Sequence, residues 1–295
     1  MTRTTSRQMA ETPSEERPGA EFAFTDRDFG FLSDIVTRHT GITLGGHKRQ
    51  LVYGRLARRL RTLGLATFEQ YCAHVDRHLD EELSELVNAI TTNLTSFFRE
   101  SHHFEHLATV ALPDILARNA ANRRLRIWSA GCSTGEEPYS IAMTVAETLG
   151  AALSSWDARI LATDIDSQVL ARAAAGMYAE DRIEGLAPAR VRRWFRRGSG
   201  ANDGRVKVNA DLQALIAFRQ LNLMDSAWPM RGPFDILFCR NVVIYFDKPT
   251  QRLLFDRYAD LLAPQGFLYI GHSESLHGVN ERFKPIGRTI YRRVA

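Results

Sequence analysis

The first third of the chain carries apolar residues at intervals of three and four, and no strand-like alternation interrupts them between residues 25 and 92. This spacing predicts amphipathic helices packed into a small helical domain. Thr25 with Asp28, and Thr67 with Gln70, match the capping pattern of a hydroxyl followed three residues later by a polar acceptor. The expected helices run from Thr25 to a stop near Gly41, over Phe68–His78 and over Asp80–Ile90.

Beyond residue 122 the pattern changes to short apolar runs separated by helical segments. This alternation implies parallel strands joined by right-handed crossovers, and therefore a doubly wound sheet. A linking helix over Ser101–Asn119 precedes it, and Pro113 predicts a kink in that helix. The expected strands are Leu125–Ala130, Arg159–Thr163, Phe234–Cys239 and Phe267–Gly271, with helices over Glu136–Leu149, Ser167–Ala175 and Pro249–Leu262.

One segment, Phe195–Leu223, interrupts the alternation with a turn containing Gly198, Gly200 and Gly204. Its two strand-like runs, Arg205–Val208 and Leu215–Gln220, indicate a small antiparallel insertion. The expected fold class is α/β: a small N-terminal helical domain, then a Rossmann-like doubly wound domain carrying the insertion. The expected boundaries are a disordered tail over 1–20, the helical domain over 21–95, the linking helix over 96–122, and the α/β domain over 123–295 with its insertion over 195–223.

Composition narrows the class of protein. Hydrophobic residues make up 44% of the 295 and charged residues 24%, as in ordinary globular proteins. No run of about 18 apolar residues predicts a membrane span, and residues 1–20 lack the apolar core of a secretory signal. Cys72, Cys132 and Cys239 lie far apart without a CxxC spacing, which favours a reducing, cytoplasmic compartment and no metal site. The formal charge of +4 permits either nucleic acid or an acidic protein surface as the partner.

The first α/β strand leads into a loop of small residues, Gly131 to Gly135, and then into a helix with Pro138 in its first turn. Small residues let a ligand approach the backbone, and proline suits the start of a helix. The next strand ends at Asp164, where a carboxylate can accept both hydroxyl protons of a ribose. Together these features predict an adenosine-type cofactor at the carboxyl edge of the sheet.

The cofactor loop lacks GxGxxG, and the chain contains no GxxxxGK[ST]. Glu136 or Glu137 stands where a dinucleotide enzyme holds pyrophosphate, and a carboxylate there repels phosphate but suits an ammonium group. This favours S-adenosylmethionine over NAD or ATP. The alternative is that the two glutamates only stabilise a helix N-terminus.

Two further clusters of polar and aromatic residues are candidates for the same site. Thr92–Glu100 mixes an amide, hydroxyls, aromatics and an arginine, and Cys239–Phe246 follows a buried strand. Asn241 and Tyr245 fall where catalytic groups collect in such sheets. The alternatives are a capped helix boundary with Phe97 and Phe98 in the core for the first cluster, and a chain-turning Asn241 for the second.

Taken together, these strings resemble the chemotaxis receptor methyltransferase (CheR) family. The matching strings are TTNLTSFFRE (91–100), STGEEPYSIAM (133–143), ATDID (162–166), FCRNVVIYFDK (238–248), GHSES (271–275) and the basic helix HKRQLVYGRLARRLRTLGL (47–65). The resemblance extends from residue 25 to 293. It implies a class I methyltransferase domain that transfers a methyl group from S-adenosylmethionine to receptor glutamates, giving methyl esters for sensory adaptation and S-adenosylhomocysteine as the product.

The resemblance also implies roles for individual residues. Glu137 would bind the ammonium of the cofactor and Asp164 its ribose, while Arg99 and Tyr245 would be catalytic, with Tyr245 beside the reacting methyl. Gly131 and Cys132 replace alanines of some relatives, a small change. The implied cofactor-binding set is Asn93, Thr95, Arg99, Glu137, Asp164, Asn222, Leu223, Arg240 and Asn241.

The implied partner is the cytoplasmic domain of a chemotaxis receptor, which would recruit this protein to receptor arrays. We expect a monomer, with no nucleic acid and no membrane insertion. The basic helix His47–Leu63 is expected to dock on the acidic receptor bundle, unless it is only a solvated face, and the insertion to bind a receptor C-terminal pentapeptide, unless it is only a structural hairpin. The receptor-binding residues expected are Lys48, Arg55, Arg58, Arg59, Arg193, Arg197, Gly198 and Gly200.

Two other functions compete. A nucleic-acid methyltransferase fits the basic charge, but the polar-aromatic motif of such enzymes usually carries prolines where this chain has Val242, Val243 and Ile244. A non-catalytic scaffold that only binds the cofactor is the second alternative, and the presence of Arg99 and Tyr245 argues against it.

Overall fold

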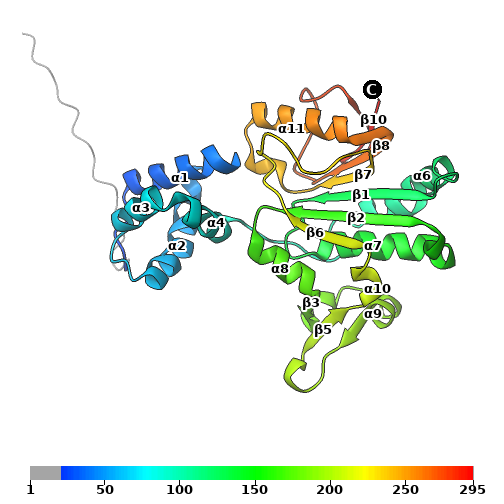
Figure 1. Ribbon diagram of the computed structural model, residues 1–295, viewed down its shortest axis with the longest axis horizontal. Helices are drawn as coiled ribbons and strands as arrows, with labels where there is room; N and C mark the ends of the chain where they lie inside the picture. Colours follow the sequence, from blue (N-terminus) through cyan, green and yellow to red (C-terminus); the bar gives the residue numbers. More distant parts are fainter. Residues whose placement is uncertain (1–20, 295) are drawn as a thin grey trace, which may run out of the picture. The chain divides into compact units, whose positions relative to one another are not determined.

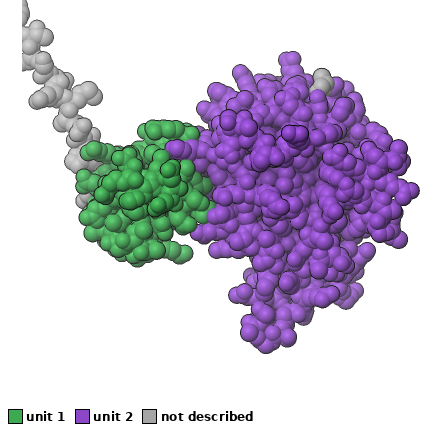
Figure 2. Space-filling view, in the orientation of Figure 1, with its two compact units in different colours: residues 1–38, 44–90 green, residues 39–43, 91–295 purple. Residues whose placement is uncertain are grey.

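The computed structural model describes residues 21–294. They form two compact units (Figure 1, Figure 2): residues 21–38 with Leu44–Ile90 form the first, and His39–Thr43 with residues 91–294 form the second. The tail expected over residues 1–20 lies outside the described residues. No helix within 21–294 combines the length and apolar character needed to cross a bilayer.

The first unit is helical, as expected. Thr25 and Asp28 form the predicted capping pair at the first helix, with Thr25 Oγ1 donating to Asp28 Oδ2 at 2.7 Å and accepting from Asp28 N at 3.2 Å. Thr67 Oγ1 likewise accepts from Gln70 N at 3.1 Å. Both predicted caps are confirmed. The helices are α1 (Asp26–Thr40, whose last two residues belong to the second unit), η1 (Gly46–Lys48), α2 (Arg49–Leu63), α3 (Phe68–Arg77) and α4 (Leu79–Ile90).

A buried carboxylate ties three of these helices together. Glu82 in α4 is 2% exposed, and it accepts two hydrogen bonds from Arg59 of α2, at 2.9 and 2.6 Å, and one from the Tyr71 hydroxyl of α3 at 2.8 Å. Burial would raise the pKa of Glu82, but these donors outweigh it and lower the pKa. Arg59 therefore has a structural role inside the helical unit.

The second unit contains a seven-stranded sheet in the order β6-β2-β1-β7-β8-β10-β9. Its first five strands are parallel, and β10 runs antiparallel to both β8 and β9. The doubly wound Rossmann-like expectation is confirmed. The strands are β1 (Arg124–Ala130), β2 (Asp157–Asp164), β6 (Ile216–Gln220), β7 (Phe234–Cys239), β8 (Leu262–Ile270), β9 (Phe283–Gly287) and β10 (Ile290–Arg293).

Side chains of successive strand residues enter two separate cores, one on each face of this sheet. Ile127 of β1 packs with residues of α7 (Glu136–Leu149), whereas its neighbour Trp128 packs with residues of α11 (Lys248–Leu261). Figure 1 shows α7 and α11 on opposite faces of the sheet. The central strands are buried on both faces, which leaves the carboxyl edge of the sheet as the place for a ligand.

The connecting elements complete this unit. The linking helix consists of α5 (His102–His106), a π-helical stretch η2 (Leu107–Ala111) and α6 (Leu112–Arg118). The π-helical stretch ends just before Pro113, where the sequence predicts an irregularity. The others are η3 (Gly150–Ser155), α8 (Ser167–Ala175), η4 (Glu180–Ile183), α9 (Pro188–Trp194), η5 (Gly200–Asn202), α10 (Ala210–Gln213) and η6 (Val243–Tyr245).

A small antiparallel sheet is present, but its membership corrects the sequence interpretation. Its order is β3-β5-β4, with β3 at Met177–Ala179, β4 at Phe195–Arg197 and β5 at Arg205–Val208. The run at Leu215–Gln220 was wrongly assigned to it, because β6 pairs in parallel with β2 in the large sheet. β6 is an edge strand in which no residue is fully buried, so its short sequence is indistinguishable from that of a strand in a surface hairpin.

Candidate functional site

The loop after β1 is shaped by glycines at positions that require them. Gly131 has φ +81°, and a Cβ added there would lie 2.3 Å from a methyl of Val242. Gly135, with φ +98°, precedes the first residue of α7. The backbone N–H groups of Gly131 and Cys132 both donate to the Thr163 carbonyl, which fixes the loop to the end of β2. The glycines thus let the loop pack closely against its neighbours at the carboxyl ends of β1 and β2.

Asp164 closes β2 and faces this loop. It is 9% exposed, its Oδ2 accepts from Ser133 N at 2.8 Å, and its Oδ1 accepts from Asp166 N at 3.0 Å. Burial raises the pKa of Asp164 to about 6, although the backbone donors oppose the shift. Each carboxylate oxygen has a second lone pair, so the group can still accept two hydroxyl protons.

The two glutamates of the α7 first turn have different partners. Glu136 pairs with Arg182 and accepts from Thr134 Oγ1 at 2.6 Å. Glu137 accepts from Ser129 Oγ at 2.7 Å and from Arg240 Nη1 at 3.1 Å. Burial raises the pKa of Glu137, against the opposing effect of Arg240. Both carboxylates therefore do more than stabilise a helix end, and Glu137 is the one joined to the end of β7.

The segment before α5 lies against the cofactor loop. Asn93 donates through Nδ2 to Asp166 Oδ2 at 2.9 Å, and its carbonyl accepts from Ser133 Oγ at 3.2 Å. Arg182 donates to the Thr95 carbonyl at 2.7 Å. Arg99 donates through Nη1 to the Leu94 carbonyl at 2.9 Å. Asn93, Thr95 and Arg99 are thus held in one turn beside the ends of β1 and β2.

The aromatic pair of this segment is divided between two environments. Phe97 is buried and makes edge contacts with Tyr178 and Phe195, as the core interpretation predicts. Phe98 is half-buried with φ +52°. The guanidinium of Arg190 lies 4.1 Å from the centre of the Phe98 ring. The core interpretation therefore holds fully only for Phe97.

Arg240 and Asn241 follow β7 directly. The Arg240 side chain is 3% exposed and bridges Glu137 to the Arg99 carbonyl. Its Nε is a buried donor without a hydrogen-bond partner among the described residues. Asn241 has φ +58°, so its backbone turns the chain at the strand end. Tyr245 ends the short helix η6 and is half-buried.

Glu274 organises this turn, although the sequence alone predicted no role for it. Its carboxylate accepts from the backbone N–H groups of Gly271 at 2.5 Å, Asn241 at 3.0 Å and Ile244 at 3.3 Å. Glu274 is 6% exposed, and burial raises its pKa despite these donors. The available signal was its place in GHSES, a polar string directly after a buried strand.

Asn222 and Leu223 follow β6 at the same edge of the sheet. Asn222 donates to the His39 carbonyl at 2.6 Å and accepts from Met224 N at 2.9 Å. Leu223 is buried in the core that includes α11. Five of the expected cofactor-binding residues therefore lie at one edge of the sheet. Their segments either follow the carboxyl ends of β1, β2, β6 and β7 or contact residues there. These five are Asn93, Glu137, Asp164, Asn222 and Arg240.

The expected receptor-binding residues fall into two groups outside this site. Arg58 is exposed on α2 of the first unit, where Arg55 donates to the Ile90 carbonyl at 2.6 Å and Arg59 is bound by Glu82. Lys48 ends η1 in the same unit. Arg193, Arg197, Gly198 and Gly200 lie in or beside the small antiparallel sheet of the second unit.

Comparisons with known proteins agree with this arrangement. A family model described as the SAM-binding domain of CheR methyltransferases matches residues 93–292, and one for their all-alpha domain matches residues 27–91. The chain is 46% identical over 282 residues to chemotaxis protein methyltransferase 2 of Pseudomonas aeruginosa, covering 95% of this chain and 98% of that protein. It is 43% identical over 272 residues to the chemotaxis protein methyltransferase of Escherichia coli, covering 91% of each.

Proposed function

The chain belongs to the CheR methyltransferase family, and we propose that it transfers a methyl group from S-adenosylmethionine to glutamate side chains of chemotaxis receptors. The observation that carries the proposal is the convergence of Asp164, Glu137 and Arg240 at one edge of the sheet, beside a glycine loop. The direct test is methyl transfer from labelled cofactor to receptor cytoplasmic fragments, with RNA as the competing acceptor.

The described residues fit the cofactor. Asp164 has lone pairs for the ribose hydroxyls, and Glu137 is an acceptor for the ammonium of the methionyl group. The unpartnered Nε of Arg240 suits the cofactor carboxylate. Asn93 and Thr95 would border the methionyl part, Asn222 and Leu223 the adenine, and Asn241 would complete the pocket.

When bound, S-adenosylmethionine supplies a methyl group on a positively charged sulfur. A glutamate carboxylate is already ionised at pH 7, so the chain needs no general base to activate it. The catalytic task of the chain is to hold the carboxylate oxygen in line with the methyl carbon and the sulfur. We assign the orientation of the incoming carboxylate to Arg99 and contact with the reacting groups to Tyr245.

Arg99 must not hold the substrate too tightly. A bidentate ion pair with the receptor glutamate would stabilise the ground state and slow the transfer. The hydrogen bond from Arg99 Nη1 to the Leu94 carbonyl occupies part of the guanidinium and leaves other donors for the substrate. This favours a single, orienting contact.

We further propose two receptor contacts. Lys48, Arg55, Arg58 and Arg59 would contribute positive charge toward the acidic receptor bundle, with Arg59 also serving the interior of the helical unit. A receptor C-terminal pentapeptide would add to the edge of β4, which within residues 21–294 pairs with β5 alone. We propose a monomer that is recruited to receptor arrays through these contacts.

The glycines of the insertion have a structural reason that supports a fixed docking edge. A Cβ on Gly198 would lie 2.0 Å from the Asn202 carbonyl oxygen, and Gly200 has φ +60°. The turn after β4 is thus compact and defined. Arg197, at the end of β4, has a side chain 74% exposed and can meet the carboxylate of a peptide.

A further inference from the structure

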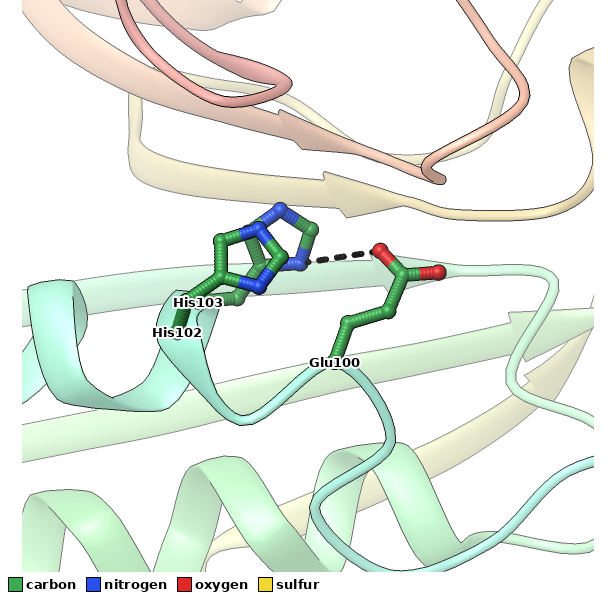
Figure 3. Close-up of side chains that lie close together, drawn as sticks. All are labelled: Glu100, His102 and His103. Carbon is green, nitrogen blue, oxygen red and sulfur yellow. Dashed lines mark ion pairs between the residues drawn. The ribbon is translucent and has the colours of Figure 1, made fainter.

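Three side chains at the start of the linking helix converge on one point. Glu100, His102 and His103 each bring one metal-ligating atom within 4.8 Å of the others. Figure 3 shows both imidazole rings and the carboxylate close together above the turn. Glu100 Oε2, His102 Nε2 and His103 Nδ1 are all buried and have no hydrogen-bond partner among the described residues. Buried polar atoms are rarely left unpaired, so three at one point call for a physical explanation.

The neighbours of His103 show which ring nitrogen carries the proton. His103 is fully buried, and its Nε2 lies 2.9 Å from Thr289 Oγ1, whose own proton is directed at the Arg288 carbonyl at 2.7 Å. Because the Thr289 hydroxyl already donates to that carbonyl, it accepts from His103, and we assign the ring proton to Nε2. Nδ1 therefore presents a bare lone pair, 3.5 Å from Glu100 Oε2.

Two lone pairs that face each other in a buried site repel unless a cation lies between them. For metal–ligand bonds of about 2.0–2.1 Å, the ligands of a tetrahedral ion are about 3.3–3.4 Å apart. The distance of 3.5 Å between Glu100 Oε2 and His103 Nδ1 is close to this ligand–ligand distance. We propose that Glu100, His102 and His103 bind a zinc ion, with the fourth position left to water. Two imidazoles and one carboxylate are a donor set that zinc accepts.

The surroundings orient the carboxylate and limit the choice of metal. Glu100 Oε1 lies 3.0 Å from His272 Nδ1. This contact orients the carboxylate so that its other oxygen, Oε2, faces the histidines of the cluster. Arg240 Nη2 is 3.6 Å from Oε2, beyond hydrogen-bond length, and this guanidinium is engaged by Glu137 and the Arg99 carbonyl. Its positive charge weakens any cation site held by oxygen alone. Binding must therefore depend on the two nitrogens, which selects zinc or cobalt over magnesium or calcium.

The position of the cluster indicates a structural role for the metal. Phe98 has φ +52° and Glu100 has φ +59°, so two left-handed residues flank Arg99. Such backbone is strained for residues with side chains and persists only when the surroundings hold it. An ion bound at Glu100 would fix this turn and with it the Arg99 carbonyl. The metal would not take part in methyl transfer itself. The sequence predicted no metal site, because the three cysteines lack a CxxC spacing.

The test uses the full, tag-free chain after removal of metals with a chelator. Titration with zinc chloride by calorimetry should give one ion per chain, and cobalt should produce the visible absorption of a tetrahedral site. His102→Ala and Glu100→Gln should each weaken zinc binding by at least about tenfold, the effect of one lost interaction of about 1.4 kcal/mol. Magnesium should not bind.

His277→Ala is the matched control, because His277 is an exposed histidine outside the cluster. It should bind zinc like the unaltered protein. His102 is only partly buried, so His102→Ala decides the matter even if the Glu100 variant fails to fold. Absence of zinc binding in the unaltered chain, or equal affinity in His102→Ala, would overturn the proposal.

Discussion

A Glu274 carboxylate oxygen accepts the backbone N–H of Asn241 at 3.0 Å, immediately after β7. The same carboxylate binds two more backbone N–H groups, so one buried side chain holds the turn that leads to Tyr245. Gly271 allows this approach, since a Cβ there would lie 2.4 Å from Asn241 Nδ2. The geometry of the methyl-transfer site therefore depends on a residue that we do not expect to touch either substrate.

We predict that Glu274→Gln lowers kcat by about tenfold or more while the Kd for cofactor changes much less. The amide replaces one acceptor oxygen by a donor that faces backbone N–H groups, which costs about 1–3 kcal/mol in a buried site. Steady-state transfer kinetics and cofactor calorimetry separate the two quantities. Glu281→Gln, at an exposed glutamate further along the chain, is the control. Equal kcat in the two variants would show that Glu274 does not position the turn.

We predict that Asp164→Asn weakens cofactor binding by about 1–3 kcal/mol, the usual effect of losing charge-assisted hydrogen bonds. The side chain keeps its size, so the fold should be retained. Calorimetry with S-adenosylmethionine measures the change directly. An unaltered Kd in the folded variant would exclude Asp164 as the ribose acceptor.

The raised pKa of Asp164 also predicts a pH dependence in the unaltered protein. Burial raises this pKa to about 6, so the carboxyl is neutral at low pH and ionised above about pH 7. The ionised form is the better acceptor, and cofactor affinity should therefore rise as the pH increases from about 5 to about 7, then level off. The cofactor-free fold has the opposite trend, because ionising a buried carboxyl removes stability as the pH rises through about 6. In the Asp164→Asn variant, the contribution of Asp164 to the pH dependence of cofactor affinity and of stability should be absent.

Whether an element of the fold or the site could be predicted from the sequence depends on how far apart in the chain its interacting residues lie. Thr67 and Asp166 cap their own helices within three residues, and four consecutive apolar residues, Ile236–Cys239, mark the strand Phe234–Cys239, so these elements could be predicted from the sequence. The pairing of Ile216–Gln220 with β2 depends on residues more than fifty positions away, and local polarity could not reveal it. The contact of Arg240 with Glu137 spans 103 positions. Such tertiary pairings become visible only in the folded chain.

The partners of the basic helix also change how receptor docking should be tested. Reversing the charge of Arg59 would leave Glu82 buried without its partner and destabilise the helical unit. Arg58 is exposed and avoids that effect. We predict that Arg58→Glu raises KM for receptor and makes it less sensitive to salt, while the Kd for cofactor is unchanged.

Arg77→Glu is the matched control for that experiment, because Arg77 is an exposed arginine of α3 in the same helical unit. It introduces the same change of charge away from α2. Identical receptor KM values for Arg58→Glu and Arg77→Glu would show that the basic helix is only exposed to solvent and does not contact the receptor.

The edge of β4 gives a test of peptide tethering. We predict that the last five residues of a cognate receptor bind this protein, and that Arg197→Ala weakens the binding while Arg196→Ala does not. Adjacent strand residues point to opposite faces, so the two arginines differ mainly in direction. Fluorescence titration up to about 1 mM peptide covers the relevant range. No saturable binding, or equal losses in the two variants, would leave the small sheet with a structural role only.

The most direct measurement of the central claim is the chemical nature of the methylated product. The unaltered protein, labelled S-adenosylmethionine and membranes carrying receptors of the same organism should yield label on the receptor that mild base releases as methanol. That release identifies a glutamate methyl ester, and mass spectrometry of receptor peptides should place it on a glutamate side chain. Arg99→Ala should reduce the label while still binding cofactor. Label that resists base, or that appears on RNA in place of the receptor, would contradict the account.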